Sequence, residues 1–157
     1  MPSLEIIAVL DAKVRELCRR PYLNHPQGCP NWNTKSGCPP QVKTFVEIFD
    51  ISRSLWAIYN RFPLGEHVEQ MRLRHPTWTE AQLVCCLYWQ PRARKQLREQ
   101  IKLFLFEHPG LWVTQCPEAL GVNVTETMSY VGHDLEWPPK NIAYQVAIAG
   151  SPRNLDA

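Results

Sequence analysis

The chain of 157 residues has only seven glycines, and they are not spaced as in a phosphate-binding loop or a dinucleotide-binding fingerprint. It has no apolar run of about eighteen residues, the length that a helix needs to cross a bilayer, so we expect no membrane partner. A strong charge is also missing. The formal net charge of +2 falls short of the basic balance typical of nucleic-acid-binding domains, which argues against nucleic acid as a partner.

The N-terminal segment has an apolar stretch but lacks the features of a signal peptide. Glu5 and Asp11 interrupt the stretch, and no small-residue cleavage site follows it. We therefore expect a cytoplasmic protein. Because the cytoplasm is reducing, its six cysteines are better candidates for metal ligands or catalysis than for disulfides.

The hydrophobic pattern predicts an α+β fold, with one compact metal-binding domain over residues 1–150 and a short tail over 151–157. Apolar residues at helical spacing, capping signals and breaking prolines mark the helices, and alternating apolar residues mark the strands. The expected helices cover 3–19, 64–74, 79–90, 92–108 and 118–131. The expected strands cover 42–49 and 55–62, paired as a β-hairpin, then 111–114 and 142–149.

Between the first helix and the hairpin lies a long irregular segment. Residues 19–41 contain five of the fourteen prolines of the chain and almost no aliphatic side chains. A loop of that length inside a compact domain is either functional or disordered. Because Cys18 stands at its start and Cys29 and Cys38 lie within it, we expect the ordered, functional case.

Three cysteines of the chain are followed directly by proline: Cys29, Cys38 and Cys116. Proline fixes φ and donates no hydrogen bond, so it stiffens the backbone beside a ligand. Iron–sulfur sites need soft thiolate ligands, a rigid loop and backbone N–H groups turned toward the sulfurs. We therefore expect Cys18 and these three cysteines to hold an iron–sulfur cluster, with four irons as the favoured type.

The spacing of the cysteines leaves other sites open. Ten residues separate Cys18 from Cys29 and eight separate Cys29 from Cys38, so there is no compact CxxC pair of the kind that structural zinc prefers. Zinc remains the alternative metal, and redox thiols or plain structural cysteines remain alternatives to any metal. His25 could replace one cysteine ligand, although its place before a proline is more typical of a turn.

Cys85 and Cys86 form a different pair. They are adjacent within an apolar run in the helix expected from Thr79, so their side chains point about 100° apart. Buried free cysteine behaves as a small hydrophobic residue. We expect both to be core residues.

With these motifs around Cys18, Cys29, Cys38 and Cys116, the sequence resembles a family of small microbial proteins described as predicted metal-binding proteins. The shared pattern is Cys, then Cys-Pro-Asn-aromatic, then Cys-Pro-Pro. The resemblance covers most of the chain and implies a cysteine-ligated metal, favouring iron–sulfur, without a settled reaction. In this sequence it stands on Cys18 to Tyr22, His25 to Trp32, Gly37 to Pro40, Cys116 to Val124 and Leu135 to Pro139.

Two functions use such a cluster. In the first, all four cysteines saturate it, and it transfers electrons to a redox partner or holds the long loop in place. In the second, three cysteines bind the cluster and one iron stays open to a small sulfur- or oxygen-containing substrate. Glu118, two residues after Cys116, is then the carboxylate best placed for proton transfer, although it also suits a helix N-terminus.

The third hypothesis is an RNA- or phosphate-binding module. Arg94, Arg98 and Lys102 recur at i, i+4 and i+8 on one helix face. Trp32, Trp78 and Trp89 are aromatic side chains that could stack on bases. The small net charge and the acidic Glu99 and Glu107 on the same helix argue against this function.

Overall fold

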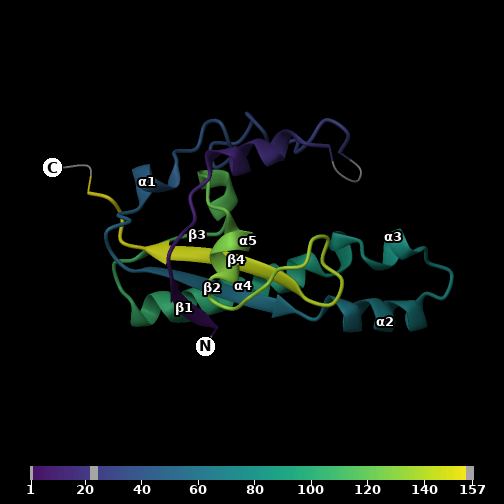
Figure 1. Ribbon diagram of the computed structural model, residues 1–157. Coiled ribbons are helices and arrows are strands. Elements are labelled where there is room, and N and C mark those ends of the chain that lie inside the picture. Colours follow the sequence, from purple (N-terminus) through teal and green to yellow (C-terminus); the bar gives the residue numbers. More distant parts are fainter. Residues whose placement is uncertain (1, 22–24, 155–157) are drawn as a thin grey trace.

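The computed structural model describes residues 2–21 and 25–154, and within them a four-stranded antiparallel sheet lies at the centre (Figure 1). The predicted α+β class is confirmed. The strands are β1 (Ser3–Ile6), β2 (Leu55–Phe62), β3 (Trp112–Thr114) and β4 (Ala143–Gly150). The α-helices are α1 (Phe45–Ile48), α2 (Leu64–Arg74), α3 (Glu80–Leu83), α4 (Gln90–Glu107) and α5 (Val124–Ser129). Short 3-10 helices are η1 (Ala12–Arg19), η2 (Cys86–Tyr88) and η3 (Pro117–Leu120).

The last strand occupies the middle of the sheet. In the order β1-β2-β4-β3, β4 is antiparallel to both neighbours, so β2 and β3 run in the same direction with β4 between them. The longest ladder joins β2 to β4 over eight residues each, from Leu55 opposite Gly150 to Phe62 opposite Ala143. The helical connection from β2 to β3 therefore spans β4, as in a split βαβ unit.

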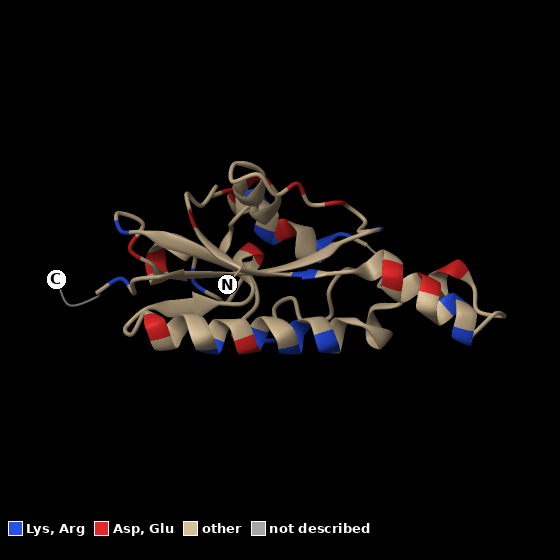
Figure 2. Cartoon of the chain, turned by 90° about the horizontal axis from the view of Figure 1, so that it is seen from below, with Lys and Arg blue, Asp and Glu red and all other residues tan. Residues whose placement is uncertain are grey.

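Both faces of the sheet are covered by apolar side chains, and side chains alternate between these faces along each strand. On one face Ile58 and Ala147 pack against Leu97, Ile101 and Phe104 of α4. Figure 2 shows α4 running along this side of the sheet. The other face packs against α1, η3 and α5 through the following buried residues: Phe45, Phe49, Ala57, Leu120, Val122, Met128, Val146 and Ile148.

The predicted N-terminal helix over 3–19 is wrong. Residues Ser3–Ile6 form an edge strand paired with β2, and only Ala12–Arg19 are helical, as a 3-10 helix capped by Asp11. The apolar run that suggested a helix also fits a strand, because β-branched residues favour strands. Pairing with β2, a long-range contact, decides between the two.

The predicted β-hairpin is half right. Its second strand is β2, but its first strand is wrong, because Phe45–Ile48 form the short helix α1. Thr44 and Glu47 make a capping box at its start, a signal that the alternating apolar pattern obscured. Phe45 and Phe49, four residues apart, are both buried and stack with ring centroids 4.7 Å apart. Burial of both rings, four residues apart, therefore favours a helix at this position over the predicted strand.

Later elements follow the predictions more closely. The helix over 64–74 and the strands near 111–114 and 142–149 are confirmed. The break at Pro91 is confirmed too, since α4 begins at Gln90 with proline in its first turn. The single helix expected over 118–131 is wrong: it is divided into η3 and α5 by Gly121, whose φ of 90° lies in the left-handed region. The helix expected over 79–90 is wrong as well, because α3 ends after four residues.

The segment assigned to the tail is attached to α1 as far as it is described. The Arg153 N–H donates to the Ile48 carbonyl at 2.7 Å, and the Asp50 N–H donates to the Ser151 carbonyl at 2.9 Å. Residues 155–157 of the tail, and Tyr22 of the cysteine motif, lie outside the described residues. Within the described part, no helix is long and apolar enough to cross a membrane.

Candidate metal centre

The long irregular segment folds back on the end of η1. The Cys29 N–H donates to the Cys18 carbonyl at 2.7 Å. Gly28 makes this approach possible, because its φ is +85° and a Cβ there would lie only 2.6 Å from the Cys18 carbonyl oxygen. Only glycine combines this conformation with so close a contact. Two predicted ligand positions are therefore neighbours through the backbone.

The third predicted ligand, Cys38, begins a rigid turn. Its own N–H donates to the Lys35 carbonyl at 3.0 Å, and its carbonyl accepts from the Val42 N–H at 3.1 Å. The next residue, Pro39, is fully buried, and its peptide bond to Pro40 is cis. We call η1 together with the described residues between 20 and 44 the cysteine layer.

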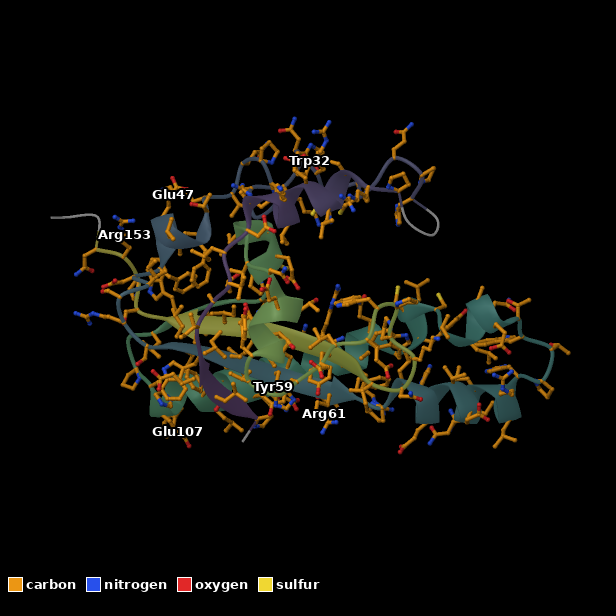
Figure 3. The ribbon with its side chains drawn as sticks, viewed as in Figure 1. Trp32, Glu47, Tyr59, Arg61, Glu107 and Arg153 are labelled. Carbon is orange, nitrogen blue, oxygen red and sulfur yellow. The ribbon has the colours of Figure 1, made fainter. Side chains whose placement is uncertain are left out.

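A guanidinium ties the end of this layer to η1. Arg15 Nη2 donates to the Val42 carbonyl at 2.6 Å, so the segment that leaves Cys38 runs beside the helix that carries Cys18. Figure 3 places Trp32, within the same layer, far from Tyr59 and Arg61 of β2. The Arg19 guanidinium lies over the Trp32 ring, 5.6 Å from its centroid.

Cys116 reaches the same region from the sheet. It precedes η3, and the next residue, Pro117, is fully buried. η3 packs against η1, and the Asp11 N–H donates to the Gly121 carbonyl at 2.8 Å. A β-bridge between Leu10 and Val122 reinforces this contact. The cysteine after β3 is therefore held beside the helix that carries Cys18.

Charges of other cysteines act on the thiols of Cys18 and Cys116. Desolvation is the main cause that raises the pKa of the Cys18 thiol, and the thiolates of Cys29 and Cys38 raise this pKa further. Cys116 is exposed to solvent, yet the protein atoms around it raise the pKa of its thiol, with further contributions from Glu118, Cys38 and Cys18. Charge interactions decay with distance and screening, so Cys18 lies within electrostatic range of Cys29 and Cys38, and Cys116 within range of Cys38 and Cys18.

Two charged side chains, Glu118 and Arg94, also act on these thiols. Only Glu118 is expected near the cysteines from the sequence. Glu118 raises the pKa of both the Cys18 and Cys116 thiols. The guanidinium of Arg94, in the first turns of α4, lowers the pKa of the Cys116 thiol. Arg94 is 22 positions before Cys116 in the sequence, and no local motif links the two. Only the packing of α4 on the sheet places its charge here.

Glu118 lines a cavity between η1 and α5, and no cysteine is among its lining residues. The cavity has a volume of about 610 Å³ and lies between η1, which contributes Leu17, and α5, with Trp137 on its wall. Solvent reaches the Glu118 carboxylate, but the protein atoms that surround it desolvate it, and this raises its pKa. Trp137 is held by its indole N–H, which donates to Thr125 Oγ1 at 2.8 Å. A small molecule in this cavity would lie next to Leu17 and Glu118, close in sequence to Cys18 and Cys116.

The described part of the chain contains no group of three or more His, Cys, Asp or Glu side chains already arranged to grip a metal ion. The donors predicted from the sequence are chemically uniform, with four sulfurs. The His25 carbonyl accepts from the Gly28 N–H at 3.1 Å, which places His25 in a turn, and ligation by its imidazole stays an alternative. All six cysteines are free thiols. The donor set therefore suits a soft metal centre.

The remaining two cysteines are not core residues, so that prediction is wrong. Cys86 is exposed and Cys85 is half-buried. The reason is the early end of α3: Cys85 becomes the residue before η2, on the surface, where a continued helix would have turned it inward. Neither residue contributes to the electrostatics of the four-cysteine group.

The residues of the nucleic-acid hypothesis are dispersed. Arg94, Arg98 and Lys102 are exposed on α4, as predicted. Trp89, however, is 7% exposed and stacks on Phe62 in the core, so it is not available to stack on a base. Trp78 stacks on His75, at 3.9 Å between ring centroids, beyond the end of α2. The three tryptophans do not form one platform.

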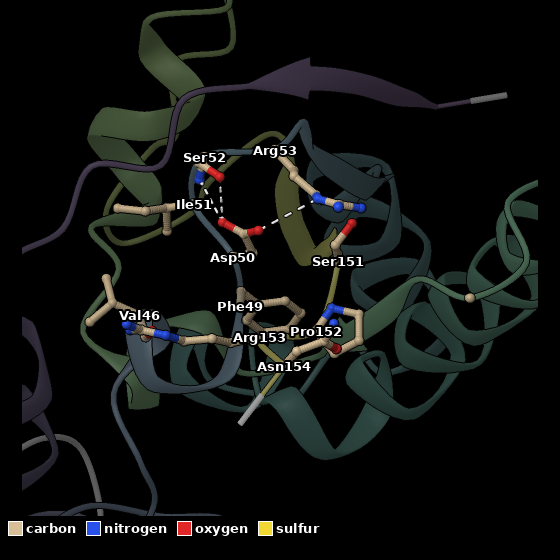
Figure 4. A pocket seen from close by; sticks show the side chains of 11 residues that line it. Val46, Phe49, Asp50, Ile51, Ser52, Arg53, Ser151, Pro152, Arg153 and Asn154 are labelled. Carbon is tan, nitrogen blue, oxygen red and sulfur yellow. Dashed lines mark hydrogen bonds and ion pairs between the residues drawn. The ribbon is translucent and has the colours of Figure 1, made fainter. Parts of the chain in front are cut away.

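A second cavity, of about 560 Å³, lies between the α1–β2 turn and residues 151–154 (Figure 4). Its polar side chains bind one another: the Asp50 carboxylate accepts from Ser52 Oγ at 2.6 Å and pairs with Arg53 at 3.5 Å. Arg153, also in its lining, donates to the Val46 carbonyl at 2.7 Å. Its charged groups are occupied with the fold, and no cysteine lines it.

Protein-family models, curated proteins and solved structures were all compared with this chain, and none of them matches it.

Proposed function

We propose that this protein binds a metal centre through the thiolates of Cys18, Cys29, Cys38 and Cys116, and that this centre is a four-iron iron–sulfur cluster. The observation that carries the proposal is the effect of thiol charges on Cys18 and Cys116. Cys18 is affected by both cysteines of the long segment, and Cys116 is affected by Cys18 and Cys38. These effects link cysteines from three separate segments and support a shared site.

A cation is the chemical partner that such a group requires. Neighbouring thiolates raise the pKa of Cys18 and of Cys116, so deprotonating these thiols together costs free energy in the protein alone. A bound metal reverses this penalty, because thiolates that coordinate a metal are deprotonated outright. The reducing cytoplasm that we propose as the location keeps such thiols available.

The choice of iron–sulfur over zinc depends on the surroundings of the sulfurs. The ligands are spread over three segments without a close pair, and structural zinc usually takes its ligands in close pairs. The prolines that follow Cys38 and Cys116 are fully buried and give each of these cysteines an apolar neighbour. The reduction potential of an iron–sulfur centre depends on its solvent exposure and on N–H groups that donate to its sulfurs. The likeness of the cysteine motifs to predicted metal-binding proteins leads us to propose membership of that family.

Such a cluster would do two things here. It would accept and release single electrons, and it would bind the cysteine layer to η3 as a cross-link. The chain's own residues prepare the site: Gly28 allows the return to Cys18, Arg15 holds the end of the segment, and Pro39 and Pro117 fix the backbone after two ligands.

The test is anaerobic purification with iron, sulfide and zinc analysis and a visible spectrum. We expect a brown protein with four irons and four sulfides per chain, as a four-iron cluster requires. Replacing Cys29 or Cys38 by serine should remove at least about nine-tenths of the iron, because either change removes a soft ligand from the set. Cys86→Ser, on the exposed surface away from the site, is the matched control and should keep full iron content.

A colourless protein with one equivalent of zinc would contradict the iron–sulfur proposal while keeping the four-cysteine site. A protein without any metal, after anaerobic isolation and reconstitution with iron and sulfide, would contradict both.

One observation favours a second candidate function, an iron–sulfur enzyme with one open iron. The cavity lined by Leu17 and Glu118 offers room for a small sulfur- or oxygen-containing substrate, and these two residues are close in sequence to Cys18 and Cys116. In this case three cysteines hold the cluster, and Glu118, whose pKa is raised, holds or releases a proton at its carboxylate. Cys116→Ala separates the two: loss of the cluster supports four ligands, and an intact cluster supports the open site.

A further inference from the structure

The cavity between η1 and α5 has charged groups of one sign only. Its lining includes the carboxylates of Glu118 and Glu126 and no lysine, arginine or histidine side chain. Its volume of about 610 Å³ falls within the range of small-molecule sites, which are mostly apolar with a few convergent polar groups. The cavity therefore combines the size of a small-molecule site with a negative charge.

Neither carboxylate has a basic side chain as its partner. Every ion pair in the described part of the chain involves Arg19, Arg53 or Arg72, and none of them includes Glu118 or Glu126. The Glu126 carboxylate accepts from neutral groups, the Asn123 side-chain amide at 3.4 Å and the Tyr130 hydroxyl at 3.3 Å. Such bonds position this carboxylate without neutralising it, so its charge remains available to a ligand.

Two arginines of the neighbouring helix η1 are engaged elsewhere. Arg15 donates to the Val42 carbonyl at 2.6 Å, and Arg19 pairs with Glu16 at 3.2 Å. Neither arginine lines the cavity. These two guanidinium groups therefore do not balance the negative charge of its wall.

An exposed aromatic ring completes the lining. Trp137 is 66% exposed, yet its indole N–H donates to Thr125 Oγ1 of α5 at 2.8 Å. The turn that follows it is also fixed, because the Glu136 carboxylate accepts from the N–H groups of Lys140 and Asn141 at 3.0 Å each. An aromatic ring that is held in place can bind a cation over its electron-rich face at little cost in conformational entropy.

The rest of the lining is largely apolar. Val14 and Leu17 are three residues apart on η1, and side chains at that spacing lie in one row along a 3-10 helix. Val124 of α5, which is buried, also lines the cavity. An inorganic cation would gain nothing from these side chains, whereas the alkyl groups of an organic cation would bury apolar surface against them.

We propose that this cavity binds a small organic ammonium ion, with the charged nitrogen near Glu118 and Glu126 and the alkyl groups against Trp137 and Leu17. Aromatic side chains are a recurrent means of recognising quaternary ammonium groups. Like charge disfavours an anion, and a dedicated metal site needs more ligands than two carboxylates supply. The inference goes beyond the proposed function and does not depend on the metal centre, because no cysteine lines the cavity.

The experiment measures the binding of choline by isothermal titration calorimetry at about pH 8, well above the ordinary pKa of glutamate. The comparison ligand is the neutral isostere of choline, the alcohol in which a carbon atom replaces the charged nitrogen. We expect choline to bind with a dissociation constant in the millimolar range or below. The neutral alcohol should bind at least about tenfold more weakly.

Two variants remove the two parts of the recognition. Glu118→Gln with Glu126→Gln keeps the size of both side chains and should erase the preference for choline over the alcohol. Trp137→Leu keeps an apolar side chain and should weaken choline binding about fivefold. Trp112→Leu is the matched control, because that ring is 58% exposed on β3 and does not line the cavity, so its loss should leave binding unchanged.

Equal binding of choline and the neutral alcohol would overturn the choice of a cation, and equal binding by the wild type and Trp137→Leu would overturn the site. No calorimetric signal at millimolar choline would overturn both. Tighter binding of a lysine-containing peptide than of choline would mean that the cavity docks a protein and not a small molecule.

Iron analysis of the same samples keeps this inference separate from the proposed function. A protein that retains iron and does not bind choline contradicts only the ammonium site. A protein that binds choline and takes up no iron on reconstitution contradicts only the cluster.

Discussion

The sheet with α4 and the cysteine layer are stabilised by different means. The first buries a continuous set of apolar side chains, among them Phe104 and Ile58 at 0% exposure, and pairs β2 with β4 over eight residues. The second buries no residue of η1 and depends on single hydrogen bonds, such as those of Arg15 and Cys29, and on prolines. A layer with so little core of its own is the part of a protein that gains most from a cross-link. The contrast supports the proposal that a metal centre cross-links this layer.

The largest expected effect tests the first region. Phe104→Ala removes a fully buried ring between α4 and the sheet and should lower the free energy of unfolding by about 3 to 5 kcal/mol. Phe106→Ala, two residues along but 88% exposed, should change it by less than about 0.5 kcal/mol. Urea unfolding followed by circular dichroism measures both. Similar losses in the two variants would mean that α4 does not pack as described.

An intermediate effect is expected in the second region. Gly28→Ala places a Cβ 2.6 Å from the Cys18 carbonyl oxygen and strains a residue with φ of +85°. The local cost should exceed about 1 kcal/mol. Amide hydrogen exchange near residues 25–29 should accelerate and metal content should fall, while exchange in β2 and β4 stays slow.

Gly37→Ala is the matched control, because a Cβ there would meet no atom within 4 Å. If it disturbed exchange and metal content as much as Gly28→Ala, the close approach at Gly28 would not be what positions Cys18 and Cys29.

The smallest effect concerns α1, which stands between the two regions. Hydrogen bonds from the Thr44 hydroxyl and N–H lower the pKa of the Glu47 carboxyl. Because this pKa is depressed, ionised Glu47 stabilises the fold at pH values above the ordinary pKa of glutamate. The contribution is lost as the pH falls through the pKa that Glu47 has in the folded protein. Glu47→Gln should therefore lower the urea midpoint at pH 7 and change it less at pH 3.

Glu107→Gln provides the comparison, since that carboxylate is exposed at the far end of α4 (Figure 3). Equal shifts at both pH values in Glu47→Gln would show that its charge does not cap α1.

The sequence was most informative where a local signal coincided with the tertiary contact. A β-rich run over 55–62 and alternating residues over 142–149 predicted the two central strands, which pair with each other over eight residues. The sequence was least informative at Ser3–Ile6, where one apolar run fits a helix or a strand. There the decision comes from pairing with β2, about fifty residues away.

In the candidate site too, residues with a local sequence signal could be predicted and residues placed by long-range packing could not. Proline after Cys29, Cys38 and Cys116 singles these residues out as predicted ligands, because it stiffens the backbone beside each of them. Arg94 gave no such sign, since its effect on Cys116 depends on how α4 crosses the sheet. Cys86 was predicted to be a core residue because its sequence neighbours are apolar. It is exposed because α3 ends at Leu83, before this residue is reached.

The place of β4 at the centre of the sheet has a consequence for synthesis on the ribosome. A chain emerges from its N-terminus, so Cys18, Cys29 and Cys38 are exposed to the cell long before residues 143–150 can join β2 to β3. Until that strand inserts, β2 lacks its main neighbour and η3 has no sheet behind it. Cys18, Cys29 and Cys38 therefore leave the ribosome well before the strand that completes the sheet.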